Sequence, residues 1–152
     1  MDLILWRHAD AEDGIPDHSR KLTVKGEKQA KDMAQWLKKR LPTETRVISS
    51  PALRATQTVS ALTDQYEILN DLDTGASTVS ILTAAGWPDA KGAVVVVGHQ
   101  PTLGQVAALL LAGAEDGWSI KKGSIWWITN RVRGEISQNL LRAVMTPDLL
   151  RP

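Results

Sequence analysis

The run Ala93-Val94-Val95-Val96-Val97 is the clearest secondary-structure signal in this chain of 152 residues. Five consecutive apolar residues, most of them β-branched, are typical of a strand that is buried on both faces in a parallel sheet. Gly98, His99 and Gln100 follow, and Pro101 then fits the first position of a helix with inward-facing apolar residues. The run therefore predicts a central strand that ends in polar residues.

Strand and helix signals alternate on either side of this run. Two short apolar segments, 3–6 and 47–48, favour buried strands. Apolar residues with helical spacing cover three further segments: 22–40, 52–62 and 76–85. Thr23 is the predicted N-cap of the first of these helices, and Gly86 ends the last. The alternation predicts an α/β fold, a three-layer sandwich whose mostly parallel central sheet is flanked by helices.

The last third of the chain has a different pattern. Residues 124–129 and 135–145 favour strands, and they flank a turn-like segment at 130–134. We therefore expect a terminal antiparallel strand pair, followed by a loose tail at 146–152. The sequence contains no repeat and no linker composition, so residues 1–152 are predicted to form a single domain.

The composition argues against several classes of protein. With 18 Lys and Arg against 17 Asp and Glu, the chain lacks the basic excess of a dedicated nucleic-acid binder. It has no cysteine, which excludes disulfides and thiolate sites. No apolar run is long enough for a transmembrane helix, and no signal peptide precedes Arg7. We expect a cytoplasmic protein that binds neither nucleic acid nor a membrane.

Arginine and histidine side chains gather where the predicted strands end. Arg7 and His8 end the first strand, Arg54 lies one turn into the helix after the second, and His99 follows the valine run. Ligands of open α/β sheets bind outside the carboxyl ends of the strands, so these four side chains are expected to share one crevice. Guanidinium groups and a helix N-terminus bind phosphate oxygens, and a neutral imidazole can attack phosphorus. The set predicts a phosphoryl-transfer site with His8 as the nucleophile, kept neutral by the neighbouring guanidinium charges.

Other interpretations of these residues are weaker. A metal site at His8 and His99 is disfavoured, because no paired-histidine spacing occurs and the flanking arginines repel a cation. His18 lies in a polar loop and is expected to be solvent-exposed. Trp126-Trp127 is better explained by strand packing than by stacking on bases. No glycine-rich dinucleotide or P-loop pattern occurs, so neither a metal nor a cofactor is expected.

Three segments resemble the histidine phosphatase superfamily, also called phosphoglycerate-mutase-like: Arg7-His8-Ala9, the segment 49–58 and Gly98-His99. Segments 20–26 and 97–103 are similar to motifs of its small SixA-type phosphohistidine phosphatases. The larger relatives have glycine at the position of Ala9.

This resemblance implies a single histidine-phosphatase-like domain in which His8 becomes phosphorylated. By the same resemblance, Arg7, Arg54 and His99 hold the phosphate, and Arg20 is a further phosphate-binding group near the mouth of the pocket.

Two features of the sequence concern the substrate. The chain between Arg54 and His99 is short and partly helical, so little of it is left for a lid, and we expect an open pocket that admits a phosphorylated side chain. No motif identifies a general acid; the weak candidates are Asp10, Asp71 and Asp73. An imidazole leaving group, with a pKa of about 6.5, depends less on such an acid than an alkoxide does.

The leading hypothesis is a metal-independent phosphatase that removes phosphate from phosphohistidine on a partner protein of the phosphorelay or phosphotransfer type. A small-molecule phosphomonoesterase of the same fold stays open as an alternative, with Asp71 or Asp73 as its proton donor. The third hypothesis is a phosphate-binding module without catalytic activity. The sequence indicates neither the identity of the partner nor the oligomeric state.

Overall fold

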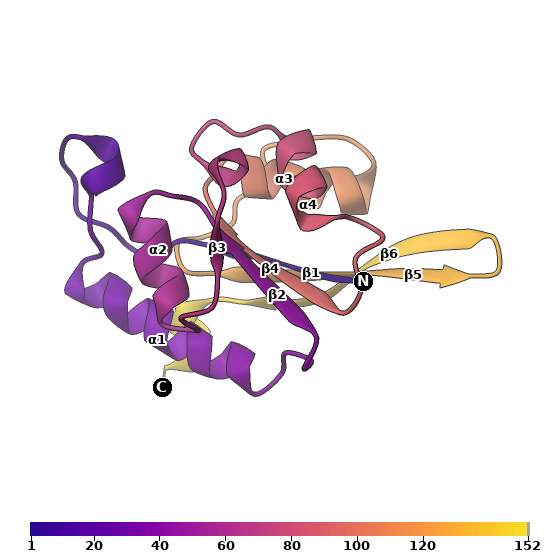
Figure 1. Cartoon of the computed structure of the whole chain (residues 1–152), viewed down its shortest axis with the longest axis horizontal. Coiled ribbons are helices and arrows are strands. Elements are labelled where there is room, and N and C mark those ends of the chain that lie inside the picture. The colour runs from indigo at the N-terminus through magenta and orange to yellow at the C-terminus, as the bar shows by residue number, and fades with distance from the viewer. Residues whose placement is uncertain (152) are drawn as a thin grey trace.

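The computed structural model describes residues 1–151, and at its centre is a six-stranded sheet (Figure 1). The strands are β1 (Asp2–Arg7), β2 (Thr45–Ser49), β3 (Glu67–Ile68), β4 (Ala93–Gly98), β5 (Ile125–Arg133) and β6 (Ile136–Met145). The helices are α1 (Val24–Lys38), α2 (Leu53–Ser60), α3 (Thr78–Ala85) and α4 (Thr102–Ala112), with short 3-10 helices η1 (Asp17–Ser19), η2 (Asn70–Leu72) and η3 (Pro147–Leu150). No helix in the described part of the chain is long and apolar enough to span a membrane.

The sheet has the order β3-β2-β4-β1-β5-β6. β4 lies between β2 and β1 and is parallel to both, and every residue of β4 is buried, as the valine run predicts. β5 is antiparallel to β1, and β6 is antiparallel to β5. The predicted α/β class, with a mostly parallel sheet and a terminal antiparallel pair, is confirmed.

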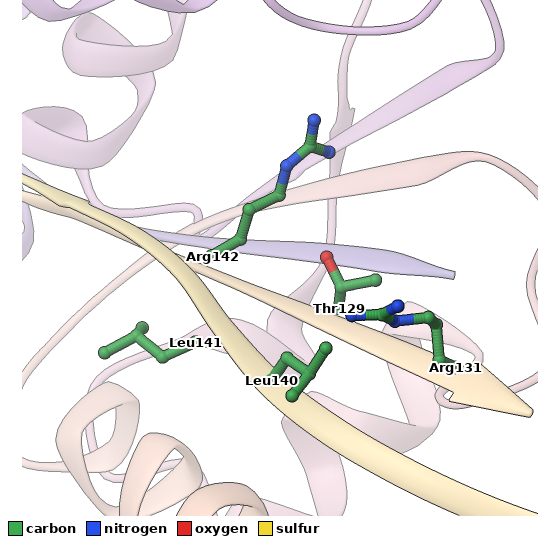
Figure 2. A pocket seen from close by; sticks show the side chains of 5 residues that line it. All are labelled: Thr129, Arg131, Leu140, Leu141 and Arg142. Carbon is green, nitrogen blue, oxygen red and sulfur yellow. The ribbon is translucent and has the colours of Figure 1, made fainter.

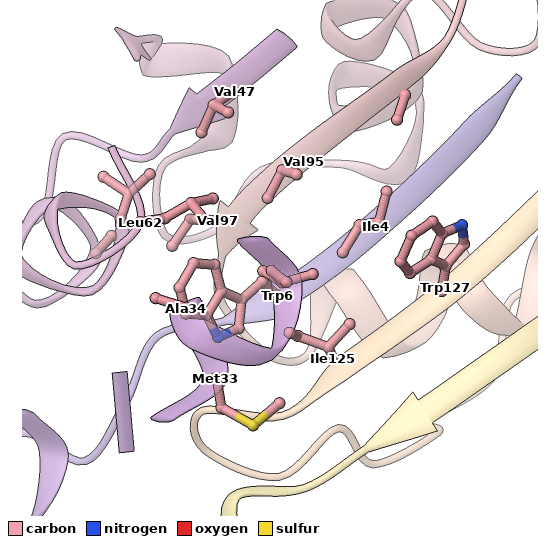
Figure 3. Packing of buried hydrophobic residues seen from close by; sticks show 14 residues of the cluster. Ile4, Trp6, Met33, Ala34, Val47, Leu62, Val95, Val97, Ile125 and Trp127 are labelled. Carbon is pink, nitrogen blue, oxygen red and sulfur yellow. The ribbon is translucent and has the colours of Figure 1, made fainter. Parts of the chain in front are cut away.

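Alternating side chains of the central strands build two separate cores. Val95 and Val97 belong to one core cluster with Met33 of α1 and with Ala55 and Val59 of α2. Figure 3 labels Met33, Val95 and Val97 of this cluster. Val94 and Val96 point to the opposite face and pack under α3 and α4. Because both faces of β4 are covered, polar side chains can follow this strand only where it ends. The residues after its carboxyl end belong to the site described below.

The predicted ends of two helices are confirmed. The Thr23 hydroxyl accepts a hydrogen bond from the Gly26 N–H at 2.9 Å and caps α1. Gly86 ends α3 in the left-handed conformation with φ of 70°, which glycine adopts without steric cost. Pro101 was predicted as the first residue of the next helix. It is instead the N-cap residue of α4, which begins one residue later, at Thr102.

Two expectations for the last third need correction. The segment 130–134 is mostly strand, because the Asn130 side-chain amide donates to the Ser137 hydroxyl and to the Asn139 side-chain oxygen, both at 2.9 Å, across the β5–β6 ladder. The turn itself is Gly134-Glu135. The tail expected to be loose forms η3 instead, and Leu150 packs against the core beneath α1. Residue 152 lies outside the described residues.

Candidate active site

A cleft of about 270 Å³ lies at the carboxyl ends of β1 and β4. It is lined by all four side chains predicted from the strand ends, Arg7, His8, Arg54 and His99, and also by Arg20. The remaining lining residues are Ala11, Asp13, Thr74, Gln100 and Lys122. The site is therefore rich in positive charge, as a phosphoryl-binding site requires.

His8 is held in a single tautomer by the backbone. Its side chain is buried, and its Nδ1 lies 2.8 Å from the carbonyl oxygen of Ala9. A carbonyl oxygen only accepts hydrogen bonds, so Nδ1 carries the proton and Nε2 keeps its lone pair. Burial lowers the pKa of His8 to about 3, although the bond to Ala9 acts to raise it. The interaction with His99 and the charges of Arg54 and Arg7 add to the lowering. The predicted effect of the guanidinium groups is present, but burial is the larger cause.

Ala9 fits the turn after β1 without strain. Its N–H donates to the Thr58 hydroxyl at 3.0 Å, and its methyl group packs with Leu22 and Ala30. None of the non-glycine residues from 1 to 151 has a positive φ. The backbone at this position therefore does not require the glycine found in the larger relatives.

The second histidine is fixed by a serine. His99 is buried, its Nε2 lies 2.7 Å from the Ser50 hydroxyl, and that hydroxyl also accepts the Ala52 N–H at 3.2 Å. The ring centroids of His99 and His8 are 5.2 Å apart. Burial and, next, the charge of Arg54 lower the pKa of His99 to about 4. The cleft thus contains two neutral imidazoles at neutral pH.

Arg7 and Arg54 are both anchored by protein carbonyl groups. Arg54 is 3% exposed, and its Nη1 donates to the backbone carbonyl of Asp17 at 2.9 Å. Arg7 donates from Nη1 to the carbonyl of Ile120, also at 2.9 Å. The Nε groups of both arginines are buried without a hydrogen-bond partner. A buried donor of this kind is costly, and a phosphoryl oxygen in the cleft is a suitable acceptor for it.

Asp17 is a contact residue that the sequence reasoning missed. Its carboxylate accepts from Arg54 Nη2 at 3.1 Å and from Arg20 Nε at 3.0 Å, so it joins the two arginines. Burial tends to raise the pKa of Asp17, but the hydrogen bonds from Arg54 and Arg20 outweigh it and the pKa is lowered. The contact joins residues 37 positions apart, and no local pattern predicts such a pairing.

None of the three predicted acid candidates lines the cleft. The Asp10 carboxylate accepts from the Thr23 hydroxyl at 2.7 Å and from Lys122 at 3.2 Å, and these contacts help to keep its pKa low. Burial tends to raise the pKa of Asp73, but bonds from the Thr74 N–H and from His18 outweigh it and lower the pKa. His18 is exposed, as predicted, although its Nε2 lies 2.9 Å from Asp73.

A second cavity, of about 430 Å³, lies on the β5–β6 hairpin (Figure 2). It is lined by Thr129, Arg131, Leu140, Leu141 and Arg142 and contains no histidine. In residues 1–151, no group of three or more His, Asp or Glu side chains is arranged to hold a metal ion. The chemistry expected from the sequence is therefore concentrated in the cleft at the ends of β1 and β4.

Comparison with known proteins defines the class. The sequence model of the histidine phosphatase superfamily (branch 1) matches residues 3–76, which include Arg7, His8 and Arg54. The chain is also 33% identical over 123 residues to a curated relative, and the match covers 74% of this chain and 76% of that protein. The chain belongs to the histidine phosphatase superfamily.

The curated relative is phosphohistidine phosphatase SixA of Escherichia coli (strain K12). The solved structure of the protein histidine phosphatase SixA complexed with tungstate matches with a TM-score of 0.80 and 28% identity, covering 99% of this chain and 100% of that one. The predicted resemblance to SixA-type members is confirmed. A phosphoserine phosphatase mutant of Entamoeba histolytica, 18% identical with a TM-score of 0.69, shares the fold over 94% of this chain and 95% of its own.

Proposed function

We propose that this protein is a phosphohistidine phosphatase that works through a covalent phosphoryl group on His8. The observation that carries the proposal is the bond between His8 Nδ1 and the Ala9 carbonyl. It leaves Nε2 unprotonated, in a cleft that also holds two arginines and a second histidine. The name of the similar relative SixA gives the substrate class independent support.

The proposed reaction has two in-line displacements. His8 Nε2 attacks phosphorus, the new P–N bond forms, and the bond from phosphorus to the substrate's imidazole nitrogen breaks. Arg7, Arg54 and His99 stabilise the charge on the equatorial oxygens, and Arg20 adds a positive group at the mouth. Water then attacks phospho-His8, inorganic phosphate leaves, and His8 returns to its neutral form. This sequence of steps needs no metal ion.

The leaving group decides between the two substrate classes. An imidazole with a pKa of about 6.5 can leave in protonated form with a proton from solvent, whereas an alkoxide needs a positioned acid. Asp10, Asp17 and Asp73 all have lowered pKa values and accept hydrogen bonds as carboxylates. They are poor proton donors at neutral pH, which favours a phosphoramidate substrate.

One observation favours the alternative, a small-molecule phosphomonoesterase. Asp13 lines the cleft and is the carboxylate among its lining residues. If the protein is a phosphomonoesterase, Asp13 is the proton donor to the alcohol leaving group, the role that the sequence assigned to Asp71 or Asp73.

Parallel turnover measurements separate the two functions. A phosphohistidine-bearing protein and a simple phosphate monoester are compared without added metal, for the wild type and for His8→Ala and Asp13→Asn. The proposal predicts fast loss of the N-linked phosphate, slow ester hydrolysis, dependence of both on His8 and independence from Asp13. Preferential ester hydrolysis that falls in Asp13→Asn contradicts it.

A further inference from the structure

A groove next to the cleft has no part in the proposed chemistry. Its volume is about 570 Å³, and it lies between the first turns of α1 and the C-terminal 3-10 helix η3. Figure 1 shows the C-terminal end of the chain beside α1. Both of these elements are held in place, because Thr23 caps α1 and Leu150 of η3 packs against the core.

The groove combines an exposed apolar side chain with a mostly basic rim. Val24, at its edge, is 84% exposed, whereas Pro147, the other apolar lining residue, is buried. Lys25 and Lys28 supply positive charge; Arg151 also lines the groove but forms an ion pair with Asp32, and Asp148 is the one acidic residue of the lining. Apolar surface with a rim of one dominant charge is typical of a protein-binding site for a partner of opposite charge.

The segment 121–123 lies between this groove and the catalytic cleft and contacts both. Lys122 lines the cleft. Its neighbour Gly123 touches the groove residues, since a Cβ built there would lie 3.0 Å from Pro147 Cγ and 3.4 Å from Gln29 Cβ. Asp10 links the two sides as well, because its N–H donates to Gln29 Oε1 at 3.0 Å and its carboxylate accepts from Lys122.

A protein substrate must cover more of the surface than the cleft. Stable protein interfaces bury about 800 Å² on each partner, far more than one histidine side chain provides. A partner whose phosphohistidine enters the cleft therefore extends over the adjoining surface, and the groove is a neighbouring region that combines the exposed Val24 with two lysines.

We propose that this groove docks the phosphohistidine-bearing substrate protein through an acidic surface with apolar side chains. The inference rests on the proposed function, because it assigns the groove to the same partner that delivers phosphate to His8. The exposed Val24 provides apolar contact area, and Lys25 and Lys28 select a partner with negative charge.

The test uses the double variant Lys25→Glu/Lys28→Glu and the single variant Val24→Ser. Glutamate is favourable in the first turn of a helix, where Lys25 lies, and it is a good helix former at Lys28 in the next turn, so the charge reversals preserve α1. For a phosphohistidine-bearing protein, we expect KM to rise about tenfold in the double variant and less in Val24→Ser, with kcat unchanged. Turnover of phosphoramidate, which is too small to reach the groove, stays at the wild-type value. The matched control Lys39→Glu/Lys91→Glu has the same charge change at the opposite end of the sheet and keeps the wild-type KM.

The possible failures are distinguishable. A wild type that hydrolyses phosphoramidate but not the protein overturns the proposed function, and the docking site with it. If the wild type hydrolyses the phosphohistidine-bearing substrate normally and the KM of the double variant changes less than twofold, only the docking site is overturned. Equal losses on protein and phosphoramidate also overturn it, because the substitutions then act on the cleft. A dimer that the charge reversals dissociate assigns the groove to a second copy of the chain, which contradicts the proposal.

Discussion

Lowering the pH from 7.5 to 5 should destabilise the protein through its two buried histidines. Burial lowers the pKa of His8 to about 3 and that of His99 to about 4, from an ordinary value of 6.5. Below pH 6.5 the unfolded chain therefore binds protons that the folded protein does not. The stability linked to these groups is present above pH 6.5 and is lost as the pH falls towards the folded pKa values.

The size of the effect follows from the two pKa values. A histidine that titrates near 3 when folded and near 6.5 when unfolded loses about 2 kcal/mol of stability between pH 7.5 and pH 5. His99 contributes about the same, also roughly 2 kcal/mol. Both side chains are almost fully buried, so solvent does not screen this difference.

Urea unfolding of the wild type and His8→Asn at the two pH values isolates the contribution of His8. The substitution removes the titrating group, so the loss of stability between pH 7.5 and pH 5 should be smaller by about 2 kcal/mol in the variant. The carboxylates titrate in both proteins and cancel in the comparison. An equal pH dependence in the two proteins refutes the reasoning, because His8 would then be protonated as readily in the folded state as in the unfolded chain.

Three further predictions concern the cleft. Arg54→Ala should lower turnover about 100-fold or more, since a buried guanidinium that stabilises equatorial oxygens is lost; a loss below about fivefold in steady-state assays places Arg54 outside the reaction. Thr58→Val should destabilise the fold by about 1–3 kcal/mol, because the buried Ala9 N–H loses its acceptor; denaturation of the variant at the wild-type midpoint contradicts this. Treatment with a chelator should leave kcat and KM unchanged, and a large loss of activity that added metal restores argues for a metal-dependent step.

The central part of the fold was predictable because its signals are local. The valine run has apolar side chains on both faces of a strand, so both faces have to be covered, and in β4 they are. Polar residues at the ends of two parallel strands must then meet at one edge of the sheet, and for this reason Arg7, His8 and His99 could be placed together. The cap at Thr23 and the helix end at Gly86 depend on neighbouring residues and were equally accessible.

The parts that escaped prediction depend on contacts between distant residues. Asn130 has turn-forming chemistry, but its side-chain bonds across the ladder keep it in β5. Leu150 has no periodic pattern around it and finds its place only against the core beneath α1. Asp17 reaches Arg54 across 37 positions of sequence, and the position of Gly123 between cleft and groove depends on the packing of η3.

The most direct test of the account is to identify the phosphorylated residue during a single turnover. The enzyme is mixed with a phosphohistidine-bearing protein, quenched in alkali, which preserves phosphohistidine, and digested for mass spectrometry. The account predicts one phosphoryl group on the peptide containing His8, attached at Nε2, and none in His8→Ala. Release of phosphate without a labelled His8, or label on His99 instead, contradicts it.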